Sequence, residues 1–173
     1  MAILPIITAP DPRLKIKAKP VERGDAGLRR LMDDMLETMY AAPGIGLAAP
    51  QVGESVRVLV LDVARDGQAR RPLKIANPEI VWASEELAAG EEGCLSLPEQ
   101  FAEVVRPAEA RIRYLDYDNV TREIEAKGML AVCLQHEMDH LEGVLFVDHL
   151  SRVKRDIILR KLVKAKRLKT AAE

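Results

Sequence analysis

The sequence has few cysteines and no long apolar run. Two cysteines among 173 residues are too few for a disulfide scaffold, and they favour a reducing compartment. No uninterrupted apolar stretch approaches the roughly 20 residues that an α-helix needs to span a bilayer. The first segment, MAILPIITAPDPRLK, lacks the basic and apolar regions of a signal peptide and is interrupted by prolines. We therefore expect a cytoplasmic protein that is not inserted in a membrane.

The chain also lacks an excess of charge of either sign. Its 26 basic and 27 acidic side chains give a net charge of -1, which excludes a global electrostatic attraction to nucleic acids or anionic membranes. Hydrophobic residues make up 48% of the chain and charged residues 31%, so the composition is not that of a disordered or collagen-like sequence. A length of 173 residues suits one domain with a buried core.

The spacing of apolar residues predicts helices near both ends of the chain and strands in the middle. Residues 25–40, 128–143 and 151–169 carry apolar side chains every three or four positions, with Asp25 and Ser151 as expected N-caps. The last of these helices contains nine basic residues and one acidic residue. Strands are predicted at 56–64, 73–76, 79–83, 102–105, 110–116 and 120–125, with a hairpin turn at 118–119. We therefore expect an α+β fold in which mixed or antiparallel strands pack around a central helix and a C-terminal helix follows.

The helix predicted over residues 128–143 carries HEMDH, an instance of the HExxH pattern. Because four residues advance an α-helix by slightly more than one turn, His136 and His140 project from one face and can bind one cation. Glu137 is then within reach of a water molecule at that cation. A chance HExxH on an exposed helix face is the alternative. Since a catalytic metal site commonly has three protein ligands and one open position, the third ligand decides the class of enzyme.

Two metallopeptidase patterns for the third ligand fail in this sequence. The extended pattern HExxHxxGxxH would need a histidine where the chain has Phe146. A glutamate on a following helix is also missing, because Asp156 is the only acidic residue of the last predicted helix. Cys94, in the stretch EEGCLSLPE that we interpret as a loop, is the better ligand, and its thiolate suits Fe(II), Zn(II) or Ni(II). The alternative for a single cysteine is a small buried hydrophobe, the role assigned to Cys133 as core or pocket wall.

Three segments together resemble the signature motifs of the peptide deformylases. They are GIGLAAPQ at 44–51, EGCLS at 92–96 and QHEMDH at 135–140. All three occur in the order and at the separations typical of that family, and the resemblance covers nearly the whole chain. It implies a single catalytic domain over residues 1–173 that removes the N-terminal formyl group from nascent polypeptides starting with formylmethionine and releases formate.

The resemblance also implies roles for individual residues. Glu137 is expected to be the catalytic acid and base, while Gln51 and the backbone N–H of Leu95 bind the formyl oxygen. The metal is expected to be Fe(II), with Zn(II), Ni(II) or Co(II) as alternatives. The expected ligands of this single divalent ion are Cys94, His136 and His140.

Substrate contacts are expected around an apolar pocket for the methionine side chain. Gly46 is expected to hold the peptide backbone, in line with the resemblance. Residues 129, 132, 133 and 136 fall on one face of the predicted helix. The expected pocket wall is Ile45, Met129, Val132 and Cys133. Ordinary core packing is the alternative for each of these four. Phe101 stands where bacterial members of the family often have a basic residue, which changes how the pocket rim meets the peptide.

Further expectations concern contacts outside the site. Glu92 and Arg106 are expected to pair and to support the segment around Cys94, the alternative being an exposed ion pair. The basic helix 151–169 is expected to dock on the ribosome, as the resemblance implies, the alternative being a solvated helix. The competing functional hypotheses are a small HExxH peptidase, a deformylase-like protein that has lost activity, and a structural metal or RNA-binding module with His149 as a fourth ligand.

Overall fold

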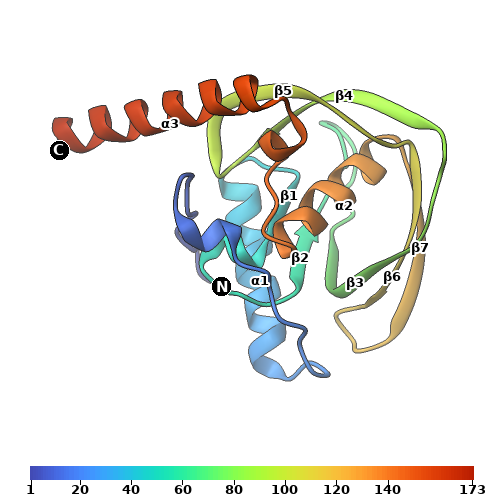
Figure 1. The fold of residues 1–173 in the computed structure, drawn as a ribbon. Helices are drawn as coiled ribbons and strands as arrows, with labels where there is room; N and C mark the ends of the chain where they lie inside the picture. The colour runs from blue at the N-terminus through green and yellow to red at the C-terminus, as the bar shows by residue number, and fades with distance from the viewer.

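The structure, a computed structural model that describes residues 1–173, consists of two antiparallel sheets and three α-helices (Figure 1). The larger sheet has five strands in the order β1-β2-β3-β6-β7. Its strands are β1 (Gly46–Ala48), β2 (Val58–Leu61), β3 (Leu73–Ala83), β6 (Glu109–Leu115) and β7 (Thr121–Lys127). The second sheet is the hairpin of β4 (Leu87–Cys94) and β5 (Leu97–Pro107). The helices are α1 (Ala26–Ala41), α2 (Gly128–Leu141) and α3 (Arg152–Ala172), with 3-10 turns η1 (Pro12–Lys15), η2 (Ala49–Val52) and η3 (Phe146–His149).

The α+β class and the three predicted helices are confirmed. Asp25 and Ser151 cap their helices, because their side chains accept hydrogen bonds from the backbone N–H groups of Leu28 at 3.0 Å and Lys154 at 3.3 Å. The hairpin turn between β6 and β7 also lies where the sequence predicts it, with Asn119 at a φ of 63°. These local signals are strong because the capping and turn residues act within a few positions of the chain.

The sequence does not predict every strand. The segment around Cys94, expected to be a loop, is the end of β4, whose sequence LAAGEEGC contains no β-branched residue and therefore gives no strand signal. Strand β1 lies inside a Gly- and Ala-rich segment and gives no signal for the same reason. Residues 73–83 form one strand rather than two. The register of β3 against β6 shifts next to Asn77, whose φ is 48°.

Helix α2 lies at the centre of the molecule, packed against the five-stranded sheet (Figure 1). Nine of its 14 residues are buried. Leu134 is fully buried in one cluster with Leu59 and Ile112 of the sheet, and burial of such a side chain contributes about 1.5–3 kcal/mol to stability. A second cluster, which contains Phe146 of η3, joins β5 to α3. The position of α2, and of any side chain on it, is therefore fixed by packing from several elements.

Helix α3 extends away from the rest of the protein (Figure 1). Only Ile158 and Leu162 of its 21 residues are buried, in the cluster with β5 and η3. Its basic side chains are therefore mostly available to a partner. Neither α3 nor any other helix combines the length and the apolar character that a membrane span requires.

Candidate metal centre

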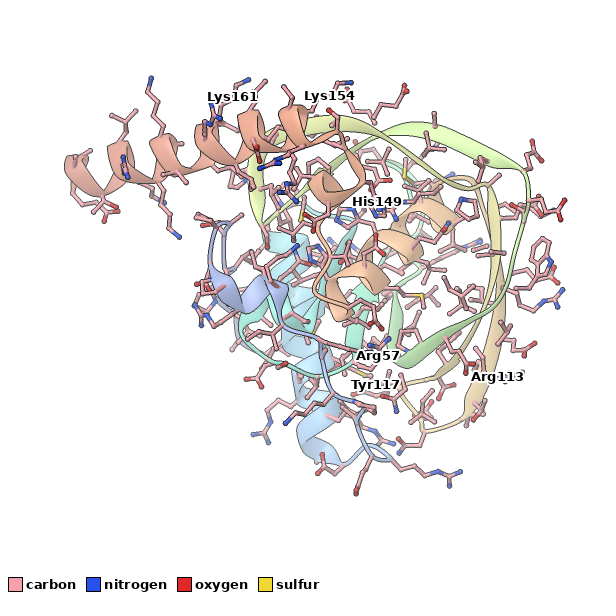
Figure 2. The ribbon with its side chains drawn as sticks, in the orientation of Figure 1. Arg57, Arg113, Tyr117, His149, Lys154 and Lys161 are labelled. Atoms are coloured by element: carbon pink, nitrogen blue, oxygen red, sulfur yellow. The ribbon has the colours of Figure 1, made fainter.

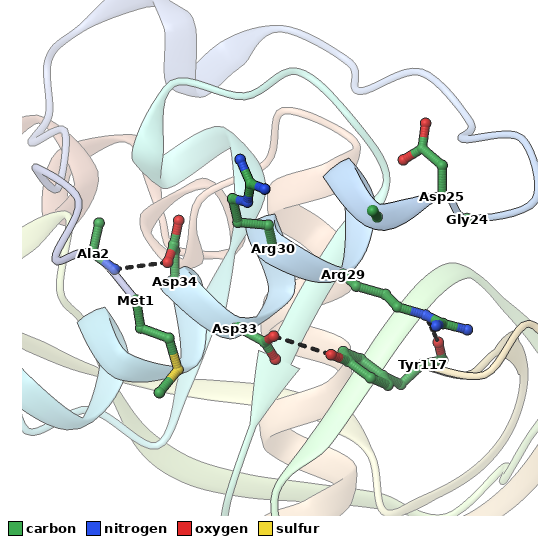
Figure 3. A pocket seen from close by; sticks show the side chains of 10 residues that line it. Met1, Ala2, Gly24, Asp25, Arg29, Arg30, Asp33, Asp34 and Tyr117 are labelled. Carbon is green, nitrogen blue, oxygen red and sulfur yellow. Dashed lines mark hydrogen bonds between the residues drawn. The ribbon is translucent and has the colours of Figure 1, made fainter.

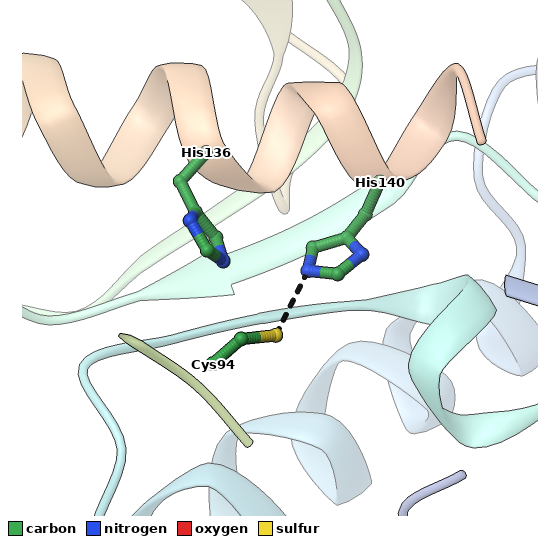
Figure 4. Close-up of side chains that lie close together, drawn as sticks. All are labelled: Cys94, His136 and His140. Atoms are coloured by element: carbon green, nitrogen blue, oxygen red, sulfur yellow. Dashed lines mark hydrogen bonds between the residues drawn. The ribbon is translucent and has the colours of Figure 1, made fainter. Parts of the chain in front are cut away.

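The three predicted metal ligands converge at one point of the structure (Figure 4). Helix α2 presents His136 and His140 toward Cys94 at the end of β4. The ligand atoms of the three side chains lie within 4.8 Å of one another, and Cys94 Sγ is 3.3 Å from His140 Nε2. The two imidazole centroids are 5.1 Å apart. A thiolate and two imidazoles so close together fit one divalent metal ion with a coordination position left open.

The β4–β5 hairpin brings Cys94 to this point. Its register shifts between Gly93, which is opposite Phe101, and Cys94, which is opposite Leu97. The extra residues on β5 include Glu99, whose φ is 62°. A Cβ at Gly93 would lie 2.5 Å from the Phe101 ring, so any other residue here would displace that exposed ring.

A buried ion pair supports His136, as expected for Glu92 and Arg106. The Arg106 Nε and Nη2 groups donate to the two carboxylate oxygens of Glu92 at 2.7 and 2.9 Å. Both side chains are at most 6% exposed, so this is not a surface pair. Burial alone would raise the pKa of Glu92, but the hydrogen bonds from Arg106 and His136 outweigh it and lower this pKa to about 2. The ionised Glu92 Oε1 accepts a hydrogen bond of 2.9 Å from Nδ1–H of His136, which leaves Nε2 to bind a metal.

Burial sets the protonation of Glu137 and His140. It raises the pKa of Glu137 to about 7, an effect that the charge of His136 opposes and that of Glu92 strengthens. Burial and the charge of His136 hold the pKa of His140 well below its ordinary value, which favours the neutral form that binds metals. Glu137 Oε2 and His140 Nδ1 are buried and have no hydrogen-bond partner in the protein. An unpaired buried carboxyl oxygen is unfavourable, so Glu137 Oε2 is suited to a water molecule or a substrate group.

The Gln51 side chain is held beside Cys94. Its Oε1 accepts a hydrogen bond of 2.9 Å from the Ala48 N–H, and its Nε2 donates to Ser96 Oγ at 3.0 Å and approaches Cys94 Sγ at 3.5 Å. The turn residue Leu95 has a backbone N–H that donates no hydrogen bond within the protein. The Leu95 N–H is therefore a free donor next to the ligand cysteine, whereas the two N–H groups of the Gln51 amide are directed at Ser96 Oγ and Cys94 Sγ.

The site opens into a cavity of about 420 Å³. A Cβ at Gly46 would lie 2.5 Å from Glu137 Oε1 and 2.8 Å from Cys133 Sγ, so only glycine lets β1 pass this close to the carboxyl group. The Cys133 thiol donates to the Ile45 carbonyl at 3.6 Å. The lining residues are Pro43, Gly44, Ile45, Gly46, Gln51, Gly93, Cys94, Leu95, Pro98, Glu99, Phe101, His136 and Glu137.

The predicted methionine pocket is only partly reproduced by this lining. Of its four predicted residues, Ile45 lines the cavity, whereas Cys133 is buried beneath β1 and Met129 is 55% exposed near the start of α2. Val132 does not line the cavity either, so these three contacts stay predictions. Phe101 lines the cavity and is 60% exposed, which puts an aromatic ring at its rim. Pro43, Gly44, Pro98 and Glu99 were not expected there, although Gly44 belongs to a motif and the others lie within three positions of one.

A larger hollow lies elsewhere and has none of this chemistry (Figure 3). Its volume is about 740 Å³, and it lies beside the first turns of α1. Two carboxylates in it are already paired: Asp34 accepts from the Ala2 N–H at 2.7 Å, and Asp33 accepts from the Tyr117 hydroxyl at 3.0 Å. None of the three sequence motifs contributes a residue to its lining, so the smaller cavity is the better candidate for catalysis.

Comparison with known proteins agrees with the geometry of the smaller cavity. A family model described as polypeptide deformylase matches residues 3–156. The chain belongs to the peptide deformylase family. A peptide deformylase of Phenylobacterium zucineum is 58% identical over 164 residues, which are 95% of this chain and 97% of that protein. The crystal structure of peptide deformylase from Ehrlichia chaffeensis has a TM-score of 0.94 at 43% identity and covers 98% of this chain and 99% of that chain. A second structure of the Ehrlichia protein, in complex with actinonin, has a TM-score of 0.92 at 46% identity and covers 96% and 99%.

Peptide deformylases are metalloenzymes that remove the N-terminal formyl group from nascent polypeptides, and this deformylase is an enzyme of that kind. The structure gives no support to a closed structural metal site, because His149 binds Asp139 at 2.7 Å and lies outside the ligand cluster. It gives none to an extended peptidase motif either. Phe146 stacks on the His136 ring, with centroids 6.2 Å apart, where that motif would need a third histidine.

Proposed function

We propose that this deformylase binds the formylated N-terminus of a nascent peptide in the cavity beside Cys94, His136 and His140 and hydrolyses the formyl amide there. The observation that carries the proposal is the buried, unpaired Oε2 of Glu137 next to these three ligands. When bound, a divalent metal ion acidifies a water molecule and polarises the formyl group. We propose Fe(II) as the metal in the cell. Zn(II), Ni(II) and Co(II) suit the same thiolate and imidazole donors.

Glu137 moves the proton in this proposal. It accepts a proton at Oε2 from the attacking water molecule and passes it to the amine nitrogen as the carbon–nitrogen bond breaks. The products are formate, which contains the water oxygen, and a peptide with a free amino group. Burial favours the protonated form of the Glu137 carboxyl group, which suits a group that must hold a proton and then donate it.

Two N–H donors stabilise the formyl oxygen as it becomes negative. They are the unpaired backbone N–H of Leu95 and the Nε2 of Gln51, whose amide is oriented by the Ala48 N–H and by Ser96. These hydrogen bonds hold Gln51 beside Cys94 before substrate arrives, and its Nε2 is proposed to turn one N–H group from Cys94 Sγ to the formyl oxygen. One donor of this kind typically contributes about 3 kcal/mol to the transition state, or roughly a hundredfold in rate.

The methionine side chain of the substrate is placed against Ile45, which lines the cavity and is 46% exposed. Met129, Val132 and Cys133 on α2 are proposed to complete this wall when substrate is bound. Gly46 is proposed to hold the peptide backbone, because it lines the cavity next to Glu137. We expect the peptide beyond its first residue to cross the exposed ring of Phe101.

Helix α3 is proposed to dock on the ribosome in the cytoplasm, where nascent chains emerge. Its nine basic residues within 151–169 and its exposed surface support this proposal, because clustered cations bind phosphate groups. Ribosome binding should then weaken steeply as the salt concentration rises.

The testing experiment is formate release from an N-formyl-Met peptide by protein purified without oxygen and loaded with Fe(II). The N-acetyl analogue is the substrate control, and Glu137→Gln is the matched variant, since it keeps the shape of the side chain but cannot carry the proton. We expect selective, chelator-sensitive release that falls by at least 100-fold in Glu137→Gln, with metal content unchanged. Folded, metal-loaded protein that releases no formate would contradict the proposal and favour a relative that has lost this activity.

A further inference from the structure

The 3-10 turn η3 contacts the metal-binding helix at two points. At its start, the Phe146 ring stacks on the imidazole of His136, with 6.2 Å between centroids and 26° between planes. At its end, Nε2–H of His149 donates to Asp139 Oδ2 at 2.7 Å. Figure 2 shows His149 at α2, far from Arg113 on β6 of the five-stranded sheet. The turn therefore contacts one ligand directly and a second side chain on the same helix.

Asp139 connects His149 to the ion pair behind the metal site. The same oxygen, Oδ2, also accepts a hydrogen bond of 2.8 Å from Arg106 Nη1. Arg106 holds Glu92, and Glu92 accepts from Nδ1–H of His136 at 2.9 Å. The side chains become less exposed along this path, from 36% for His149 and 26% for Asp139 to 6% for Arg106 and 4% for Glu92. A continuous line of hydrogen bonds thus runs from the surface to a metal ligand.

We propose that His149 is a positioning residue for the metal centre, which it supports through Asp139, Arg106 and Glu92. The inference rests on the metal site proposed above. Its physical basis is the rigid, planar guanidinium of Arg106, which binds Asp139 on one edge and Glu92 on the other. Without the hydrogen bond from His149, the Asp139 carboxylate can move, and the Arg106 guanidinium bound to it can then rotate. That rotation shifts the Glu92 carboxylate, which orients His136. Partners of this kind typically change metal affinity by 10- to 100-fold when they contact the ligand directly.

His149 acts from outside the catalytic cavity. It lines a second cavity of about 470 Å³ together with Asp139, Arg106 and Arg57. That cavity shares no lining residue with the cavity at Cys94. His149 therefore does not touch the substrate, and its effect should appear in metal retention rather than in peptide binding.

The experiment measures the dissociation rate of Co(II) from the full-length protein with excess chelator, together with the Co(II) absorption spectrum. His149→Phe keeps a flat ring but removes the N–H donor, and His149→Gln keeps a donor. Asp139→Ala removes the acceptor, and Arg113→Ala is the control because it removes an exposed ion pair with Glu123, between β6 and β7. The melting temperature of each metal-free protein is recorded alongside.

We expect His149→Phe to release Co(II) about three- to tenfold faster than wild type and to shift its spectrum, less than a direct partner would because three side chains intervene. His149→Gln and Arg113→Ala should stay at the wild-type rate. In an Asp139→Ala background, His149→Phe should add nothing further, since the path is already broken.

Three results would overturn the inference: a wild-type rate for His149→Phe, an equal acceleration in His149→Gln, or the same acceleration on top of Asp139→Ala. If Asp139→Ala does not fold, the comparison of Phe with Gln at position 149 decides alone. Failure of the metal site itself is a separate outcome, because wild-type protein would then not bind one Co(II) per chain.

Discussion

Replacing Gly46 by alanine tests how closely β1 approaches the catalytic carboxyl group. The new Cβ would lie 2.5 Å from Glu137 Oε1, against the 3.4 Å at which ordinary contact begins, so the carboxyl group must move by about 0.9 Å. Cys133 Sγ, at 2.8 Å from the same point, blocks part of the space below. A misplacement of about 1 Å at a reacting group costs roughly 100-fold in rate, and overpacking of this kind lowers stability by about 1–3 kcal/mol.

We therefore expect Gly46→Ala to lower kcat/KM for an N-formyl-Met peptide by about 100-fold while Cys94, His136 and His140 retain one metal ion per chain. The assay is formate release, with metal content and urea unfolding measured on the same preparation. Gly90→Ala in β4 is the matched control, because nothing lies within 4 Å of its added Cβ. Wild-type kcat/KM in folded Gly46→Ala would refute the reasoning, and so would an equal loss in Gly90→Ala.

The remaining predictions concern stability and docking. Arg106→Met leaves a buried carboxylate without its partner and should lower the free energy of unfolding by about 3–5 kcal/mol; a loss below 1 kcal/mol in urea unfolding would contradict this. A second stability prediction concerns the buried Asp62. Burial alone would raise the pKa of its carboxyl group, but hydrogen bonds from Tyr40 and two backbone N–H groups outweigh burial and lower this pKa below its ordinary 3.8. Its stabilisation is therefore complete above that pH and is lost as the pH falls through the lower folded-state pKa, so Asp62→Asn should lose less melting temperature than wild type on acidification. Reversing the charges of Arg160 and Lys164 should reduce the fraction of the protein that sediments with ribosomes at low salt, without changing formate release from a short peptide. An unchanged fraction would argue against docking by α3.

The metal site could be predicted from the sequence because its signals are local or few. HEMDH places two imidazoles and a carboxyl group on one helix by spacing alone. Cys94 follows as the third ligand once the peptidase patterns fail, although the strand that carries it gives no sequence signal. The identity of a ligand can thus be inferred without the element that positions it, since a ligand is recognised by its chemistry and β4 is formed by its pairing with β5.

The contacts that support the site could be predicted only in part. Glu92 and Arg106 were expected to pair, and the structure adds that Arg106 also binds Asp139, 33 positions away. The spacing of apolar residues in the sequence cannot predict a contact between residues so far apart, because that contact depends on how the β4–β5 hairpin lies against α2. The methionine pocket shows the same limit. Helical spacing puts Met129 on the face of His136 but does not reveal that it lies largely exposed near the start of α2.

Position 146 explains why the sequence suggests an extended peptidase motif without completing it. The chain leaves α2 and reverses at Gly143, where φ is 72° and a Cβ would meet the Lys15 carbonyl at less than ordinary contact distance. The reversal brings residue 146 back to His136, the neighbourhood in which the longer motif has its third histidine. The spacing of the motif therefore places residue 146 beside His136, and the residue type at 146 decides whether that residue can bind the metal. Phenylalanine there packs on a ligand, so the third donor must come from elsewhere in the fold, and the hairpin supplies it as Cys94.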